Sequence, residues 1–212
     1  MDTLDRLLDS GVVAVLRGID PDDMPAVADA LQAGGVTALE VTADGHDASG
    51  TIADLVPEVS DDVLVGAGTV MDPATASRVI EAGAEFVVSP HLDHEVVETA
   101  NRRGVTVGPG VMTPTEAADA MAAGADLIKV FPASTVGPGH LGAIAGPLGD
   151  VPIMPTGGIG PDNVESFFDA GAAVVGAGSA LIDYDAIERG DYDAVEAHAR
   201  EFVAAVEDAR EN

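Results

Sequence analysis

The feature that most constrains the fold of this chain is a repeating unit, in which a helical segment ends at glycine and a short valine-rich segment follows. It recurs as "LQAGGVTALEVTA", "IEAGAEFVVSP", "NRRGVTVGPGV", "MAAGADLIKVFPA" and "FDAGAAVVGAGSA". A glycine just past a helix end adopts the left-handed conformation that closes the helix. The helix beginnings also repeat, because Asp, Thr or Gly precedes Pro in "DPDDM", "DPATA", "TPTEA" and "GPDNV". This is the pattern of an N-cap followed by proline in the first turn.

We interpret the valine-rich segments as β-strands. They are apolar throughout, as strands are in a parallel sheet that is buried on both faces. Evenly spaced β-then-α units in a chain of 212 residues favour a closed (β/α)8 TIM barrel over a doubly wound open sheet. The predicted strands are residues 12–18, 38–43, 64–70, 86–90, 105–111, 127–133, 152–158 and 174–180.

No linker-like change of composition interrupts the pattern. We therefore predict one α/β domain over residues 1–212, with a last helix over residues 191–209. Apolar residues make up 47% of the chain and aromatic residues only 3%, so the core must be built from Val, Ala, Leu and Ile.

The charge of the chain is strongly negative, at −28 from 37 acidic and nine basic residues. No basic patch is available to meet a phosphate backbone, which argues against a nucleic-acid partner. The high apolar content argues against disorder. The near-complete loss of lysine indicates adaptation to molar salt, where a Debye length of about 3 Å makes such self-repulsion tolerable.

The chain contains no cysteine, which excludes disulfides, thiolate catalysis and Cys-ligated metals. Its beginning, "MDTLDRLLDSG", lacks an apolar signal region, and no apolar run approaches the ~18 residues of a membrane span. We therefore expect a cytoplasmic protein with no membrane association. The candidate metal ligands are the five histidines, His46, His91, His94, His140 and His198. His91 and His94 are three residues apart at the start of a helix, and we expect them at the surface or rim rather than in a metal site.

The only lysine, Lys129, lies in the apolar run "DLIKVFPAS". In barrels of this type the chemistry takes place at the carboxyl ends of the strands. Arginine stays charged and cannot replace an unprotonated amine, whereas burial favours the neutral amine that attacks carbonyl groups. Alternation places Lys129 and Phe131 on one face of the strand, which would bring Lys129 to the barrel mouth if that face is inward. We predict imine formation by Lys129; the alternative is a buried stem whose ammonium reaches the rim.

Glu40 is a carboxylate inside the strand pattern "ALEVTA". It could neutralise Lys129 or Arg17 in a structural ion pair, or act as a general acid/base. A buried carboxylate beside a cation can do both.

Two glycine-rich strand ends, "PTGGIGPDN" and "VVGAGSAL", indicate a phosphate site. Backbone N–H groups in such turns bind anions, and the loops after the seventh and eighth strands of a barrel are its usual phosphate site. A phosphate site formed by backbone N–H groups also needs no lysine side chain.

Taken together, these motifs resemble the 2-keto-3-deoxy-6-phosphogluconate (KDPG) aldolases and the related 4-hydroxy-2-oxoglutarate (KHG) aldolases. The matching pieces run in order over about residues 10–182. They are "VVAVLRG", "GGVTALEVT", "VGAGTV", "EAGAEFVVSP", "GPGVMTPTEA", "IKVFPAS", "IAGPLGDVPIMPTGGI" and "VGAGSAL".

The resemblance implies a homotrimeric class I aldolase that needs neither metal nor other cofactor. By position, Lys129 matches the Schiff-base lysine and Glu40 the general acid/base. Residues matching the pyruvate side of the pocket are Arg17, Thr69, Pro90, Phe131 and Thr156. Residues matching the phosphate-side loops are Gly157, Gly158, Gly178 and Ser179. One position departs from the family: Asp44 stands where some members carry an arginine that would help to hold an anionic substrate.

The reaction that the resemblance implies is cleavage of KDPG to pyruvate and glyceraldehyde 3-phosphate, in a sugar-acid pathway of the Entner-Doudoroff type. The galactonate epimer and 4-hydroxy-2-oxoglutarate are alternative substrates. More distant alternatives are another phosphate-binding barrel enzyme, such as a sugar-phosphate epimerase or a thiamine-phosphate synthase, and a barrel that only binds a metabolite.

Overall fold

The computed structural model describes residues 1–45 and 47–211. All of its strands pair in parallel, as the valine-rich pattern predicts. They are β1 (Val12–Leu16), β2 (Ala38–Thr42), β3 (Leu64–Gly68), β4 (Phe86–Val88), β5 (Thr106–Gly108), β6 (Gly110–Val111), β7 (Ile128–Val130), β8 (Ile153–Pro155) and β9 (Val175–Ala177).

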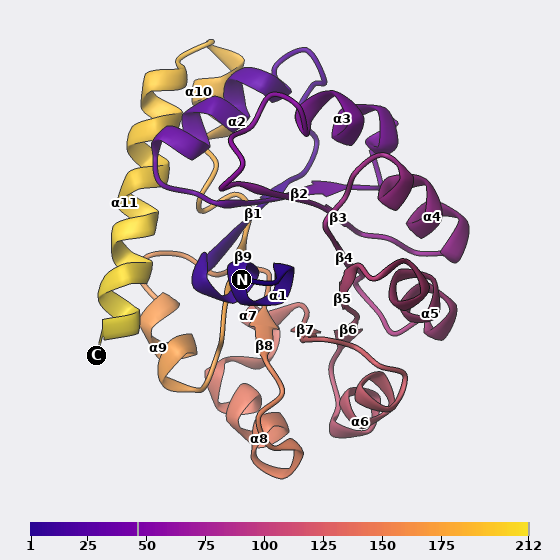
Figure 1. The fold of residues 1–212 in the computed structure, drawn as a ribbon. Helices are drawn as coiled ribbons and strands as arrows, with labels where there is room; N and C mark the ends of the chain where they lie inside the picture. The colour runs from indigo at the N-terminus through magenta and orange to yellow at the C-terminus, as the bar shows by residue number, and fades with distance from the viewer. Residues whose placement is uncertain (46, 212) are drawn as a thin grey trace.

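Helices surround the strands, which curl around a common axis (Figure 1). The helices are α1 (Thr3–Asp9), α2 (Met24–Ala33), α3 (Ala48–Leu55), α4 (Pro73–Glu81), α5 (His94–Arg103), α6 (Pro114–Ala122), α7 (Ala133–Val136), α8 (Pro138–Leu148), α9 (Val164–Asp169), α10 (Tyr184–Glu188) and α11 (Tyr192–Glu211). The long last helix that the sequence predicts corresponds to α11, which packs against α2 and α9. No helix within the described residues has the length and apolar character needed to span a bilayer.

The ladders form two curved sheets, in the orders β5-β4-β3-β2-β1-β9 and β6-β7-β8. Pro109, which has no N–H to donate, separates β5 from β6, although its carbonyl accepts the Lys129 N–H at 2.9 Å. On the other side, β8 and β9 meet through the single parallel bridge Thr156↔Gly176. The predicted α/β fold with a parallel sheet is confirmed, whereas a continuous ladder of eight closed strands is not shown.

The predicted strands begin within one residue of the observed ones, but most end up to three residues too late. Those last residues, such as Pro90, Phe131 and Ser179, belong to loops that line a cavity. A loop at a strand end can turn its backbone and side chains toward a ligand.

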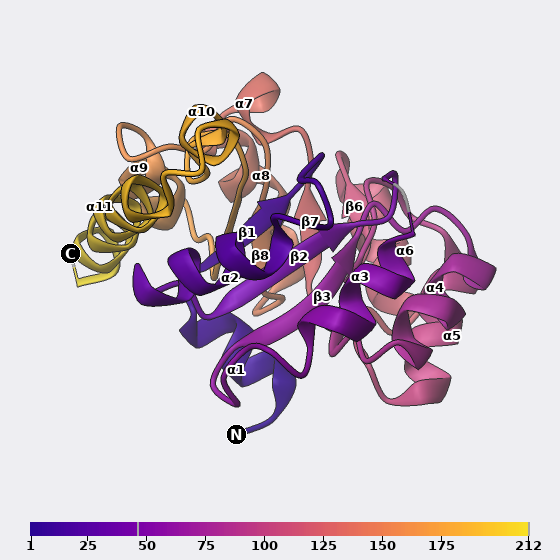
Figure 2. The ribbon, with the colours of Figure 1, turned by 90° about the horizontal axis from the view of Figure 1, so that it is seen from above.

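The core has an outer layer between strands and helices and a smaller inner cluster. The inner cluster includes Phe86, Leu127 and Met154, with Leu7 of α1 packed against them. Helix α1 is not among the predicted elements. Asp2 caps its N-terminus, because the Asp2 carboxylate accepts the Asp5 N–H at 2.8 Å. Figure 2 shows α1 at one end of the strands and α7 and α10 at the other. Helix α1 therefore covers one end of the strands, and the opposite end, where the strand-end loops lie, is left for a site.

Candidate active site

A cavity of about 450 Å³ lies at the carboxyl ends of the strands. It brings together every residue for which the sequence predicts a role, from seven different strands or strand ends. Its lining is Val15, Arg17, Glu40, Thr69, Pro90, Lys129, Phe131, Thr156, Gly157, Gly158, Gly178, Ser179 and Tyr184.

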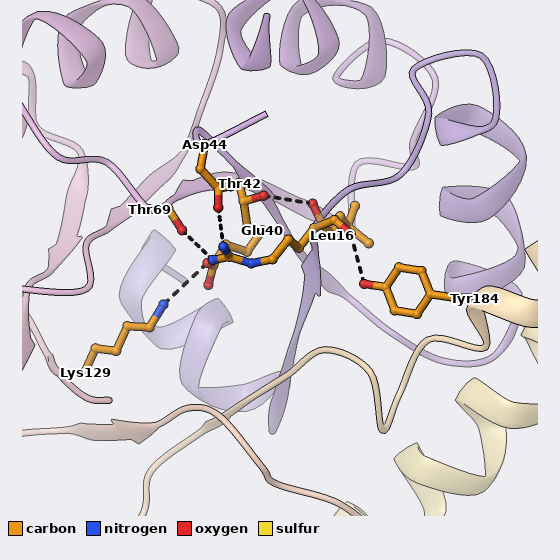
Figure 3. A network of polar contacts seen from close by, with 8 residues as sticks. Leu16, Glu40, Thr42, Asp44, Thr69, Lys129 and Tyr184 are labelled. Carbon is orange, nitrogen blue, oxygen red and sulfur yellow. Dashed lines mark hydrogen bonds and ion pairs between the residues drawn. The ribbon is translucent and has the colours of Figure 1, made fainter. Parts of the chain in front are cut away.

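The centre of the cavity is a buried pair of side chains, Lys129 of β7 and Glu40 of β2. The Lys129 Nζ lies 3.4 Å from the Glu40 Oε1, and these side chains are 6% and 0% exposed. Figure 3 shows the lysine side chain extended toward the carboxylate. The same amine lies 5.8 Å from the centre of the Phe131 ring, within the range of a cation–π contact. A single amine is thus presented to the cavity between a carboxylate and an aromatic face.

Glycine residues make room for these inward-facing groups. A Cβ on Gly68 would overlap the Glu40 carboxylate, and a Cβ on Gly176 would overlap the Thr156 hydroxyl. The parallel pairing of β2 with β3 places Thr42 beside Gly68 and Glu40 beside Gly66. Where a larger residue would fill the space between the strands, glycine leaves room for a carboxylate and for a ligand.

Two oxygens in the cavity are buried without a hydrogen-bond partner among the described residues, the Glu40 Oε2 and the Thr156 Oγ1. Buried polar atoms are nearly always satisfied by protein or water. Both oxygens are therefore available to a hydroxyl group or water molecule that enters the cavity.

Arg17 follows β1 and supplies the second cation of the cavity. Its Nη2 donates to the Thr69 hydroxyl at 2.9 Å, and its Nη1 forms an ion pair with Asp44. Thr69 has a φ of +54°, which is unusual for a β-branched residue and marks a backbone held by its surroundings. Since a guanidinium has five N–H donors, this network leaves donors of Arg17 for a ligand.

The remaining predicted residues form the rim and the far wall. Pro90 follows β4, and Phe131, 37% exposed, follows β7 at a cis peptide bond to Pro132. Gly157 and Gly158 have φ values of +95° and +74°, so the turn after β8 depends on glycine. Gly178 and Ser179 lie directly after β9.

Two lining residues, Val15 and Tyr184, are not among the predicted site residues. Val15 shares a face of its strand with Arg17, so alternation could have identified it. Tyr184 begins α10, and its hydroxyl donates to the Arg17 carbonyl at 3.1 Å. Burial raises the pKa of Tyr184 above its ordinary value of 10.0, so the phenol stays protonated. No sequence pattern marks a contact between positions so far apart in the chain.

The histidines do not gather in the described structure. The His140 Nε2 lies 2.7 Å from the Met112 carbonyl, and the His198 Nε2 lies 3.0 Å from the Ala180 carbonyl. His94 is the first residue of α5, His91 precedes that helix, and His46 lies outside the described residues. Within the described ranges, His, Asp and Glu form no group of three that could hold a metal ion.

Residues 4–198 match the family model described as "KDPG and KHG aldolase". Among curated proteins, the chain is 41% identical to the KHG/KDPG aldolase of Escherichia coli K12 over 181 residues, which cover 84% of this chain and 83% of that protein. It is 36% identical to the 2-dehydro-3-deoxy-6-phosphogalactonate aldolase of the same organism over 171 residues, covering 80% and 83%.

Among solved structures, the chain is similar to KDPG aldolase from Legionella pneumophila, with a TM-score of 0.88 and 30% identity. The similarity covers 95% of this chain and 98% of that one. That structure is described as holding pyruvate captured at low pH as a covalent carbinolamine intermediate.

Proposed function

Because the chain belongs to the KDPG and KHG aldolase family, we propose that it is a class I aldolase that cleaves KDPG to pyruvate and glyceraldehyde 3-phosphate. The observation that carries this proposal is the Lys129–Glu40 pair, a single buried amine 3.4 Å from a carboxylate and inside a cavity. The covalent carbinolamine in the Legionella relative supports the same chemistry, since a carbinolamine precedes an imine.

In the first step, the unprotonated Lys129 amine attacks the C2 ketone of the substrate and forms a carbinolamine. Protonation of the carbinolamine hydroxyl allows water to leave, and a protonated imine remains. Glu40 is placed to take the amine's proton and to return it to the departing hydroxyl, because its carboxylate contacts the Lys129 Nζ.

In the second step, Glu40 removes the proton of the C4 hydroxyl, directly or through one water molecule. The C4–O bond becomes a carbonyl, the C3–C4 bond breaks, and its electron pair moves into the imine to give an enamine. Glyceraldehyde 3-phosphate leaves. Protonation of the enamine at C3 and hydrolysis of the resulting imine release pyruvate and restore the Lys129 amine. The Glu40 Oε2, which has no hydrogen-bond partner among the described residues, is the oxygen available for this proton transfer.

The rest of the cavity supports a substrate with a negative group at each end. On the pyruvate side, we assign the carboxylate to Arg17 and Thr69, and the surrounding wall to Pro90, Phe131 and Thr156. Arginine recognises carboxylates through its planar set of donors. On the far side, we assign the phosphate to the glycine-rich turns, where backbone N–H groups bind anions without a further cation; these residues are Gly157, Gly158, Gly178 and Ser179.

The similarities include both a KHG/KDPG aldolase and a galactonate-type aldolase. The galactonate epimer and 4-hydroxy-2-oxoglutarate are thus alternative substrates of the same site. Pyruvate release from the two phosphorylated epimers and from 4-hydroxy-2-oxoglutarate, measured side by side, tests the proposal. We expect the highest kcat/KM with the gluconate-derived epimer; a clear preference for either of the others would reassign the substrate, and no release from any of them would reject aldolase activity.

We also propose that the two curved sheets act as one closed (β/α)8 barrel. The Thr156↔Gly176 bridge and the Lys129 N–H to Pro109 carbonyl bond, which span the two gaps between the sheets, support closure. Family membership supports a homotrimer, which light scattering in solution tests.

A cytoplasmic location is supported by the substrate, because a phosphorylated sugar acid carries several charges and does not cross a membrane unaided. Adaptation to molar salt is supported by the net charge of −28 and by the single lysine. Activity that rises from about 0.1 M to about 1 M salt would agree with this adaptation.

A further inference from the structure

The cavity contains two cationic side chains among its described lining residues, and each is paired with a carboxylate. Lys129 is paired with Glu40, and Arg17 is paired with Asp44. Asp44 does not itself line the cavity. In Figure 3 the dashed lines from Asp44 and Thr69, which mark their contacts with Arg17, converge beside Glu40. The two pairs leave the cavity without a net positive charge to attract an anion.

The Arg17–Asp44 pair is close to the surface, with the two side chains 52% and 37% exposed. Such a pair is weak and is screened by salt, unlike the buried pair beside it. A carboxylate that approaches Arg17 from the cavity meets a guanidinium whose charge Asp44 already balances. It also meets the field of a chain with net charge −28.

We propose that Asp44 is an internal competitor of the substrate carboxylate for Arg17, and that it makes keto-acid affinity depend on ionic strength. This inference rests on the proposed function, because it concerns the carboxylate that an aldolase substrate presents. Asp44 is a positioning residue that acts through Arg17. At low salt it holds the guanidinium and opposes the incoming anion, and at high salt its charge is screened and the guanidinium is released to the ligand.

The test is the pyruvate concentration that gives half-maximal borohydride-trapped adduct, measured at about 0.1 M and about 1 M salt, where the Debye lengths are about 10 and 3 Å. Asp44→Asn removes the charge and keeps an oxygen that can accept from Arg17. Asp29→Asn is the matched control, because Asp29 is an exposed residue of α2 outside the cavity lining. Both variants change the net charge of the chain by one unit, so a difference between them reports the position of Asp44 beside Arg17 and not the net charge.

We expect Asp44→Asn to lower the half-saturating pyruvate concentration by about two- to fivefold at low salt, with a smaller difference at high salt. Asp29→Asn should match the wild type at both salt concentrations. An unchanged or higher half-saturating concentration for Asp44→Asn would overturn the inference, since it would show that Asp44 is neutral or orients Arg17 productively.

A second measurement separates an effect through Arg17 from a general effect of charge. In an Arg17→Gln background, the Asp44→Asn change should no longer alter the pyruvate dependence, because the group for which Asp44 competes is gone. A decrease of the same size in that background would contradict the inference. Failure of the wild type to form any adduct would instead reject the proposed function, so the two failures are distinguishable.

Discussion

The Lys129 amine lies 3.4 Å from the Glu40 carboxylate, in a pair of side chains that are 6% and 0% exposed. Removing two such groups from water costs several kcal/mol per ion, and their mutual attraction often does no more than offset this cost. A buried ion pair is therefore weak evidence of stabilisation. Here one carboxylate oxygen is left without a partner among the described residues. The pair is therefore better explained by proton transfer at a reacting amine than by stability.

Glu40→Gln should keep the shape of the site and remove its base. We expect kcat for aldol cleavage to fall by about 10²- to 10⁴-fold, the usual contribution of a general acid/base. Trapping of pyruvate on Lys129 should still occur, although more slowly, because the amine is unchanged. A kcat within about tenfold of the wild type would assign proton transfer to another group or to water.

Gly68→Ala should disturb the site without replacing any residue that touches substrate. The added Cβ would overlap the Glu40 carboxylate and displace it from Lys129. We expect kcat to fall and the free energy of unfolding to decrease by about 1–3 kcal/mol, as for other overpacked cores. Steady-state kinetics and denaturant unfolding measure the two effects.

Gly139→Ala is the matched control for that substitution. Gly139 is exposed in α8, and a Cβ there would meet nothing within 4 Å. Activity should be unchanged, and stability should stay the same or rise by up to about 1 kcal/mol, because Ala favours helix. Equal loss of activity in the two variants would rule out a specific effect through Glu40.

Tyr184→Phe should test the residue that connects α10 to Arg17. The substitution keeps the ring in the cavity wall and removes the hydrogen bond to the Arg17 carbonyl. We expect stability to fall by about 0.5–1.5 kcal/mol and KM to rise a few-fold with little change in kcat, since the bond positions a binding residue. A large fall in kcat at unchanged KM would instead give the phenol a part in the chemistry.

Glu116→Gln should reveal a pH-dependent contribution to stability. The Glu116 carboxylate accepts the Met112 and Thr113 N–H groups at 2.8 and 2.9 Å at the start of α6. The Met112 bond is the largest of the effects that lower the pKa of Glu116 below its ordinary value of 4.5. Because the pKa is lower in the folded state, the stabilisation is present above pH 4.5 and is lost as pH falls through the lowered value.

Gln keeps the capping geometry but does not titrate. The wild type should therefore melt at a higher temperature than Glu116→Gln near neutral pH, and this gap should close as pH falls below 4.5. Thermal unfolding across that range measures the gap. A gap that does not change with pH would exclude the ionised carboxylate as its source.

The repeat of glycine-ended helices and valine-rich runs is sufficient to predict the strands, because both features are local. It also places Lys129 and Phe131 on one strand face, and both residues line the cavity. The predicted strands extend past the observed strand ends, because a strand and the loop that follows it can have the same apolar or glycine-rich composition. Tertiary contacts determine which of the two forms.

Contacts between residues far apart in the chain could not be predicted from local sequence patterns. Tyr184 reaches Arg17 across 167 positions, and Asp44 reaches the same residue across 27. Both contacts depend on the curvature that brings β9 beside β1 and on the loop after β2. Asp44 departs from the family pattern in the sequence, but its contact with Arg17 depends on how the strands are arranged in space.

The most direct test of the account is to trap pyruvate on the chain with borohydride and to find the modified residue. Lys129 is the only lysine, so the N-terminal amine is its one competitor among the amines of the sequence. Trypsin cleaves after an unmodified Lys129 but not after a modified one, so modification should leave residues 104–189 as a single peptide with added mass.

We predict that this long peptide carries the adduct. The variants Lys129→Arg and Lys129→Met, both still folded by circular dichroism, should carry none and should not cleave substrate. An unmodified peptide ending at Lys129 after incubation with pyruvate and borohydride, or cleavage activity that survives in the Lys129 variants, would contradict this prediction.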